Sequence, residues 1–143
     1  MRALLDVNVL IALLDSGHLH HKVATAWLER ELPAGWASCP ITQSGCIRIM
    51  SQPSYPATLP AADVAARLAE AADTSFHAFW PDDVNLLSAN AVNWPQVLGH
   101  RQLTDVYLLA LAVRHKGRLV TLDRRVPLKA VPGAKAEHLL ELV

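Results

Sequence analysis

The sequence predicts a single α/β domain, residues 1–143, built on a short and mainly parallel central sheet. Short apolar runs that suit buried strands alternate along the chain with longer stretches of helical periodicity. A chain of 143 residues has the size of one domain, and its 52% hydrophobic and 18% charged residues allow a sizeable core. No repeat, low-complexity tract or long linker divides the chain.

The first half of the chain predicts alternating strands and helices. The apolar run Ala3-Leu4-Leu5 ends at Asp6 and predicts a buried first strand. A short helix is expected over 9–14, and apolar residues at three-and-four spacing predict an amphipathic helix over 20–32. The other elements expected here are a strand over 36–39, helices over 41–50 and 61–72, and a proline-rich loop over 52–60 between those helices.

The second half predicts a strand over 76–80 and a helix over 84–92. Residues 103–115 are apolar almost all round, which is typical of a helix in the centre of a core. Residues 118–122 form the clearest strand pattern in the chain. The last segment, 136–143, fits either an edge strand or a short helix, and its sequence does not decide between them.

Several classes of protein are excluded. No apolar stretch approaches the roughly 20 residues of a membrane span, and Asp6 comes too early for the apolar core of a signal peptide. Two cysteines, Cys39 and Cys46, make neither a disulfide framework nor a zinc knuckle, and they suit a reducing compartment. We therefore expect a cytoplasmic protein with no membrane association.

The net charge of zero hides an uneven distribution. Residues 53–95 carry one basic and five acidic side chains, whereas residues 96–143 carry eight basic and four acidic ones. Clustered arginines and lysines bind phosphate groups by counterion release, even on a neutral protein. The ordinary alternative is a solvated helix face.

Three aspartates are expected to meet at one edge of the sheet. Asp6 and Asp123 each follow directly on a predicted strand, and parallel strands place both carboxylates at the carboxyl edge, where open α/β sheets bind ligands. Asp105 lies in the first turn of the apolar helix and, unless it is only a cap following Thr104, it reaches the same edge. Converging acids repel one another, and a hard cation such as Mg²⁺ removes that repulsion. Such a site suits metal-assisted hydrolysis of phosphodiesters.

The local sequences carry a resemblance to a known family. They are Asp6-Val7-Asn8-Val9-Leu10-Ile11, the stretch from Asp15 to Leu28, Thr42-Gln43-Ser44-Gly45-Cys46-Ile47-Arg48, Leu103-Thr104-Asp105 and Leu119-Val120-Thr121-Leu122-Asp123-Arg124. In this order, and over nearly the whole chain, they resemble the PIN-domain ribonucleases. The closest similarity is to the VapC toxins of prokaryotic toxin–antitoxin pairs.

The resemblance implies a three-layer α/β/α PIN-like fold and an endoribonuclease that depends on Mg²⁺ or Mn²⁺. By this likeness Asp6, Asp105 and Asp123 are the metal-site acids and RNA is the substrate. A cognate antitoxin would block the site, and the chain would form a homodimer. Trp27, on the early amphipathic helix, is a candidate for a groove that takes an antitoxin helix.

Gln43 departs from the family pattern, which commonly has Glu on the helix after the second strand. Gln keeps a carbonyl oxygen but lacks the negative charge, so three acids would hold one metal ion adequately and a second only weakly. Gln43 is then either a tolerated variant in the catalytic set or the mark of a weakened enzyme. The substitution Gln43→Glu is expected to tighten Mn²⁺ binding if this residue lies at the metal.

Supporting roles fall to neighbouring polar residues. Asn8 either orients Asp6 or a metal-bound water, or caps the following helix. Thr121 shares a strand face with Asp123 and could bond it or a phosphate, although strand propensity also explains a threonine. Thr104 precedes Asp105 in the first helical turn. Candidate contacts to the RNA backbone are Arg124 and Arg125 first, then Arg48, with Arg101, Lys116 and Arg118 more simply explained as solvated surface.

Two alternative functions remain at this stage. The first is a PIN-like binding module whose activity has decayed through Gln43, although the presence of three acids argues against it. The second is a haloacid-dehalogenase-like phosphatase with Asp6 as nucleophile, in which Asn8 would stand where an acid is needed. The RNA that would be cut cannot be read from the sequence.

Overall fold

The computed structural model describes residues 1–143, and it confirms an α/β fold on a parallel sheet. Five strands lie in the order β3-β2-β1-β4-β5, and every neighbouring pair is parallel. The sheet is short because no strand exceeds four residues. The strands are β1 (Ala3–Leu5), β2 (Trp36–Ser38), β3 (His77–Phe79), β4 (Arg118–Thr121) and β5 (Leu139–Glu141).

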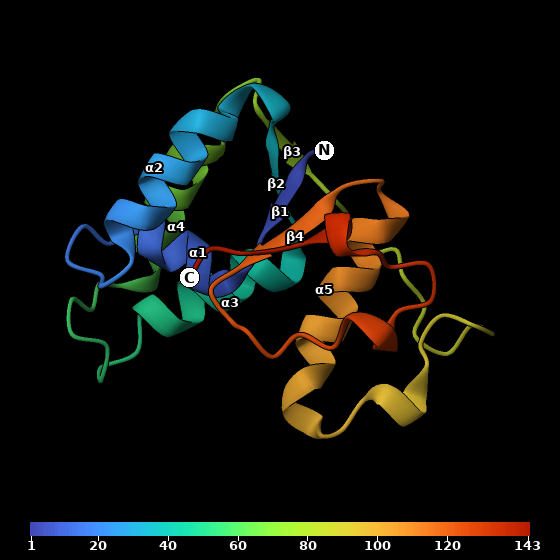
Figure 1. Ribbon diagram of the computed structural model, residues 1–143. Helices are drawn as coiled ribbons and strands as arrows, with labels where there is room; N and C mark the ends of the chain where they lie inside the picture. The colour runs from blue at the N-terminus through green and yellow to red at the C-terminus, as the bar shows by residue number, and fades with distance from the viewer.

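Helices cover both faces of this sheet and complete the expected three layers (Figure 1). Four helices, α1 to α4, pack on one face, and α5 packs on the other. The helices are α1 (Val7–Leu14), α2 (His21–Glu31), α3 (Pro40–Met50), α4 (Ala61–Ala72) and α5 (Leu103–Arg114). Five 3₁₀ turns complete the structure: η1 (Leu32–Ala34), η2 (Trp94–Gln96), η3 (His100–Gln102), η4 (Leu128–Ala130) and η5 (Ala136–His138).

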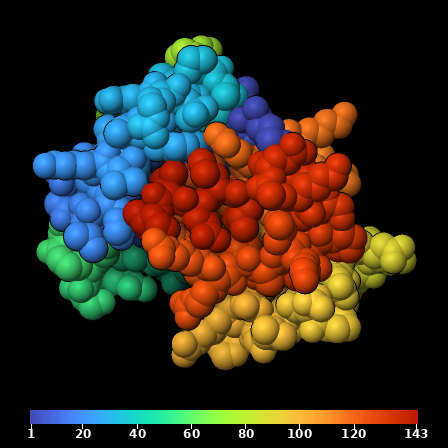
Figure 2. All heavy atoms as spheres, viewed as in Figure 1, coloured from blue at the N-terminus to red at the C-terminus, as the bar shows by residue number.

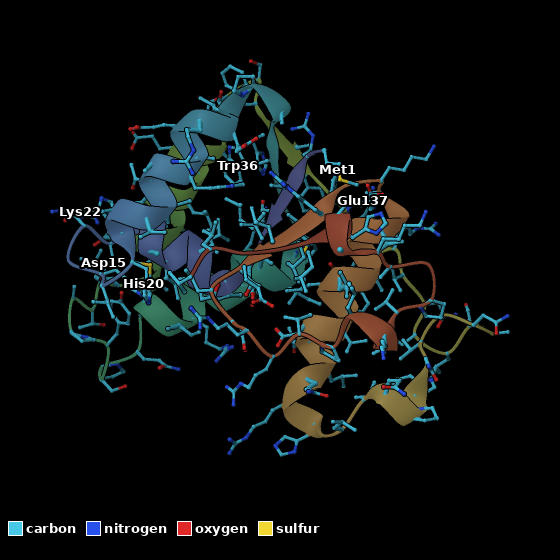
Figure 3. The ribbon with its side chains drawn as sticks, in the orientation of Figure 1. Met1, Asp15, His20, Lys22, Trp36 and Glu137 are labelled. Carbon is cyan, nitrogen blue, oxygen red and sulfur yellow. The ribbon has the colours of Figure 1, made fainter.

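Strand alternation divides the apolar residues between two cores. Leu4 and Leu119 point to the face covered by α5, whereas Leu5 and Val120 point to the face covered by the other helices. All four are fully or almost fully buried. Figure 3 shows Trp36 of β2 beneath α2, between this helix and the sheet. Because both faces are covered, the strands read as continuous apolar runs in the sequence.

The strand order places a topological switch beside β1. From β1 the chain first builds β2 and β3 on one side, and later returns to build β4 and β5 on the other side. The register pairs Leu5 of β1 with Val120 of β4, so these two strands end side by side. In open α/β sheets the crevice outside such strand ends is the usual ligand site.

The helix predicted over 84–92 is absent, and this expectation was wrong. The segment is an irregular loop that extends away from the sheet at the right of Figure 1. The Asn85 side chain accepts a hydrogen bond from the Leu87 backbone N–H at 3.0 Å, and Asn90 adopts a positive φ of 62°. Asparagine favours such local turns over helix because its side chain competes for backbone donors.

The structure shows how the proline-rich loop over 52–60 packs and which structure the last segment, 136–143, adopts. The loop over 52–60 is held against α1 and α3, since the Tyr55 hydroxyl donates to Asp15 and the Leu59 N–H donates to the Met50 carbonyl at 3.2 Å. The last segment contains both expected structures in turn, η5 and then the edge strand β5. Figure 2 shows these last residues, in red, spread over the centre of one face. No helix has the length and apolar character needed to cross a bilayer.

Candidate active site

Asp6 occupies the end of β1 and the start of α1. Its Oδ1 accepts a hydrogen bond from the Val7 N–H at 2.7 Å, so this carboxylate caps the helix, and α1 begins two residues earlier than the sequence predicts. The residue is only 6% exposed. Burial raises the pKa of Asp6, an effect that the hydrogen bond from Thr121 opposes and the charge of Asp123 reinforces.

Thr121, the last residue of β4, connects two of the aspartates. Its hydroxyl donates to Asp6 Oδ2 at 2.7 Å and accepts from the Asp123 N–H at 3.0 Å. Asn8 extends this network, since its Oδ1 accepts from the Leu122 N–H at 3.1 Å and its Nδ2 lies 3.4 Å from Thr121 Oγ1. Asn8 therefore ties α1 to the end of β4, and Asp6 rather than Asn8 caps the helix.

Asp105 completes the acidic group from the first turn of α5. The Asp105 side chain forms no hydrogen bond or ion pair with another residue, although the residue is partly buried. Burial raises the pKa of Asp105 to about 6, and the negative charges of Asp6 and Asp123 add to this rise, while Arg125 lowers it. The charges of Asp6 and Asp123 thus act on Asp105, which lies in the first turn of the helix beside the ends of β1 and β4.

A hollow of about 230 Å³ opens beside two of these acids. It lies between the start of α5, the turn that precedes α5 and the loop that follows β4. One of its seven lining residues is apolar. The lining residues are Leu98, Gly99, Arg101, Gln102, Asp105, Asp123 and Arg125.

The predicted basic residues have different surroundings. Arg125 lines the hollow, with its Nε 3.6 Å from Asp123 Oδ1 and its side chain 85% exposed. Arg124 instead donates from Nε to the Val143 carbonyl at 2.7 Å. Arg48 and Thr104 are exposed and do not line the hollow, and Thr104 makes no capping bond. Of the two adjacent arginines, Arg125 is thus the one at the acids.

Gln43 is placed apart from this group. Its Nε2 donates to Ser38 Oγ at 3.0 Å, and Ser38 Oγ lies 2.8 Å from His77 Nε2. Gln43 lines a different, mainly apolar depression between α3 and α4 and has no hydrogen bond to any aspartate. The residue of α3 that packs tightly against the start of α1 is Gly45, where an added Cβ would lie 2.6 Å from Val7 Cγ2. Helix α3 contains no acidic residue.

The turn before α5 contributes residues that sequence reasoning missed. Leu98, Gly99 and Gln102 were not predicted to be functional, and Arg101 was explained as solvated surface. These residues carry no pattern that marks a site. The only available signal was their position a few residues ahead of Asp105.

The donor set fits a hydrated divalent cation. No three Asp, Glu, His or Cys side chains are gathered tightly enough to enclose a metal ion by themselves. An ion here would need water or substrate oxygens as well as carboxylates, which is the coordination that Mg²⁺ prefers. Asp105 supports this fit, because a partly buried carboxylate with no protein partner and two acidic neighbours favours a nearby cation.

Comparison with known proteins identifies the family. The PIN domain model matches residues 3–133. The chain is 49% identical over 142 residues to Ribonuclease VapC44 of Mycobacterium tuberculosis, covering 99% of this chain and 100% of the relative. It is 45% identical over 135 residues to Ribonuclease VapC39 of the same organism, covering 93% and 96%.

Two solved structures share the fold at low sequence identity. VapC20 of Mycobacterium tuberculosis, a Sarcin-Ricin loop cleaving toxin, superposes with a TM-score of 0.61 at 11% identity, covering 91% of this chain and 99% of that one. VapBC2 of Rickettsia felis, bound to a promoter DNA fragment, gives a TM-score of 0.59 at 15% identity, covering 89% and 94%. The fold, the family model and the curated relatives agree, and the phosphatase alternative is overturned. The chain belongs to the PIN-domain family, as an endoribonuclease of the VapC group of toxin–antitoxin systems.

Proposed function

We propose that this endoribonuclease hydrolyses RNA phosphodiester bonds with a divalent cation, Mg²⁺ or Mn²⁺, held by Asp6, Asp105 and Asp123. The observation that carries the proposal is the convergence of these acids: Thr121 bonds both Asp6 and Asp123 at the ends of β1 and β4, and Asp105 of α5 lines the same hollow as Asp123. Repulsion among converging acids lowers the stability of a protein, and a bound cation offsets it.

The residues around the acids have separable tasks. When bound, the cation supplies charge neutralisation and an activated water for attack on phosphorus. Thr121 fixes Asp6 through its hydroxyl and Asp123 through the backbone. Asn8 keeps the end of β4 against α1. Arg125, exposed at the rim of the hollow, is suited to hold an RNA phosphate close to the acids.

Cleavage of total cellular RNA by the purified chain tests this proposal. We expect cutting with Mg²⁺ or Mn²⁺, none with EDTA, and none by an Asp6→Asn variant of confirmed fold. Equal cutting by variant and wild type would contradict the role of Asp6. No cutting by folded wild type with either metal would favour the decayed binding module, which Gln43 suggested at the outset.

We also propose that an antitoxin segment covers an apolar groove on the other side of the sheet. The groove, of about 480 Å³, lies between α1, α2 and α4, and ten of its thirteen lining residues are hydrophobic. Trp36 lines it and the earlier candidate Trp27 does not, although both are 5% exposed and belong to the core on this face of the sheet. An amphipathic helix is the usual occupant of such a groove. The VapBC2 structure, which contains a toxin–antitoxin pair by its name, supports this kind of partner. A homodimer remains an expectation from the family resemblance.

A further inference from the structure

We propose that the turn before α5 is a nucleotide subsite: Leu98 supports one unpaired base of the RNA, and Arg101 holds the phosphate next to it. This inference rests on the proposed function, because it takes the acids beside the turn as the place of cleavage. It assigns a binding role to residues 98–102, which the family match leaves unassigned.

Leu98 is an apolar side chain in a polar setting. It is 83% exposed and is the one apolar residue among the seven that line the hollow. Its backbone is fixed, since the Leu98 N–H donates to Gln102 Oε1 at 2.9 Å and the Gln102 N–H donates to the Gly99 carbonyl at 3.1 Å. A leucine held outward on a rigid turn gains nothing from its own fold. It presents an apolar surface of the kind on which a base can rest.

Gly99 keeps the space in front of this surface open. Its φ of −178° is ordinary extended backbone, so the conformation does not require glycine. An added Cβ would meet no atom within 4 Å, so packing does not require glycine either. Gly99 nevertheless lines the hollow, so a side chain at this position would add atoms to the wall of the hollow beside Leu98.

The charges of the hollow suit a nucleic-acid backbone. Arg101 is exposed on one wall and pairs with no carboxylate, and Arg125 stands on the wall that follows β4. Two guanidinium groups flank the acids Asp105 and Asp123, so a phosphate can be held near a cation on these acids. An apolar platform with neighbouring cations matches a single unpaired nucleotide.

Binding measurements with two probes test the assignment. The probes are a fluorescent single-stranded RNA 12-mer of mixed sequence and an abasic 12-mer that has the same phosphates without bases. All variants are made in an Asp6→Asn background, which stops turnover and leaves every lining residue of the hollow in place. Fluorescence anisotropy in Mg²⁺ gives the affinity, and a salt series gives its dependence on phosphate contacts.

Each residue has a distinct expected signature. Leu98→Ser is expected to weaken binding of the mixed 12-mer about fivefold and to leave the abasic probe unchanged. Arg101→Gln is expected to weaken both probes about five- to tenfold and to reduce the salt slope by about 1. Gly99→Leu is expected to weaken the mixed 12-mer at least fivefold by filling the hollow.

Matched controls isolate the effect of the subsite. Arg30→Gln removes an exposed arginine of α2, on the other face of the sheet, and Gly17→Leu adds the same side chain as Gly99→Leu to a remote exposed loop. Both are expected to bind as the background does. Three results would overturn the subsite. They are equal effects of Leu98→Ser on the two probes, no effect of Arg101→Gln, and an Asp6→Asn parent that binds neither probe.

The outcomes separate this inference from the proposed function. Metal-dependent cleavage with unaltered binding by the Leu98 and Arg101 variants would refute the subsite alone. The expected binding pattern without any metal-dependent cleavage would refute the catalytic proposal alone.

Discussion

At the scale of single residues, the acids of the site reduce the stability of the chain that carries them. Asp105 and Asp63 offer a direct comparison, because each is the third residue of its helix, α5 and α4 respectively. Both interact favourably with a helix N-terminus. Only Asp105 is also partly buried beside two other acids.

Replacing Asp105 by Asn should therefore stabilise the metal-free protein. We expect the free energy of unfolding in EDTA at pH 7 to rise by about 1 kcal/mol, because the substitution removes a desolvated charge. Added Mn²⁺ should raise the melting temperature of the wild type but not of this variant. Denaturant and thermal unfolding measure both effects.

Asp63→Asn is the control, expected to cost ~0.5 kcal/mol at most through the lost helix-dipole interaction. Equal stabilisation by both substitutions, or destabilisation by Asp105→Asn, would contradict repulsion among Asp6, Asp105 and Asp123.

Thr121 allows a second test, since its single hydroxyl serves two aspartates. Thr121→Val should lower the free energy of unfolding by about 1–3 kcal/mol, because Asp6 Oδ2 loses its hydrogen bond in a buried position. It should also raise the Mn²⁺ concentration needed for half-maximal cleavage. Thr121→Ser keeps the hydroxyl and should retain most of both properties. A loss in Thr121→Ser without a loss in Thr121→Val would point to packing of the methyl group instead.

Gln43→Glu tests where the side chain of residue 43 acts. The sequence alone suggested that it tightens Mn²⁺ binding, but Gln43 donates to Ser38 and has no bond to the aspartates. In the cleavage assay, we expect the Mn²⁺ concentration that gives half-maximal cleavage to stay within about twofold of the wild-type value. Tighter binding would show that residue 43 reaches the cation during catalysis.

At the scale of elements, the contact of β3 with β2 involves His77, and we expect protonation of this residue at low pH to destabilise the fold. His77 Nε2 of β3 lies 2.8 Å from Ser38 Oγ, and its ring packs against Trp36 with centroids 4.4 Å apart and the two planes tilted by 55°. Burial lowers the pKa of His77 below 6.5, and the nearby charge of Arg2 lowers it further. The unfolded chain therefore takes up this proton at a higher pH than the folded one.

The stability that His77 contributes is complete above about pH 6.5 and is lost as the pH falls through its lower folded pKa. We expect the free energy of unfolding to fall between pH 7 and pH 5 in the wild type, and to fall less in His77→Gln. Urea unfolding at both pH values measures this, with exposed His100→Gln as the control. Identical pH slopes in wild type and His77→Gln would remove His77 from the acid response.

The same scale shows what the sequence can predict. Apolar runs and periodicity predicted four of the five strands and all five α-helices because both faces of the sheet are buried, whereas β5 lies in the segment for which the sequence left strand and helix open. The false helix over 84–92 has comparable apolar content, but the Asn85 side chain accepts from the Leu87 backbone N–H and Asn90 adopts a positive φ, features that periodicity does not register.

For the site, strand ends and the first turn of a buried helix predicted the three aspartates. The surroundings of the side chains could not be predicted. Which of Arg124 and Arg125 faces the acids depends on the hydrogen bond between Arg124 and Val143. The position of the Gln43 side chain depends on its hydrogen bond to Ser38 of β2. Both are long-range contacts that no local pattern encodes.

At the scale of the whole molecule, the proposed antitoxin groove and the catalytic hollow share no lining residue. The groove lies between α1, α2 and α4, whereas the hollow lies at the start of α5, at the lower edge of Figure 1. Mutations can therefore address binding of a partner and cleavage of RNA separately.

Leu28→Glu, in the groove, should weaken inhibition by a cognate antitoxin at least tenfold, because a charge is buried without a partner. Cleavage of RNA by the free chain should remain unchanged. Leu19→Glu is the control, since Leu19 is 87% exposed and lies outside the groove. Full inhibition of Leu28→Glu in a titration with antitoxin would exclude this groove as the docking site.

The pairing of β1 with β4 also bears on when the enzyme can first act. Asp6 is synthesised before Thr121 and Asp123, and Thr121 follows it by 115 residues. A ribosome that makes this chain therefore holds a partial protein whose acids are not yet assembled. If the proposed site is correct, activity begins only when β4 has joined the sheet, and the incomplete chain cannot cut RNA near the ribosome that is making it.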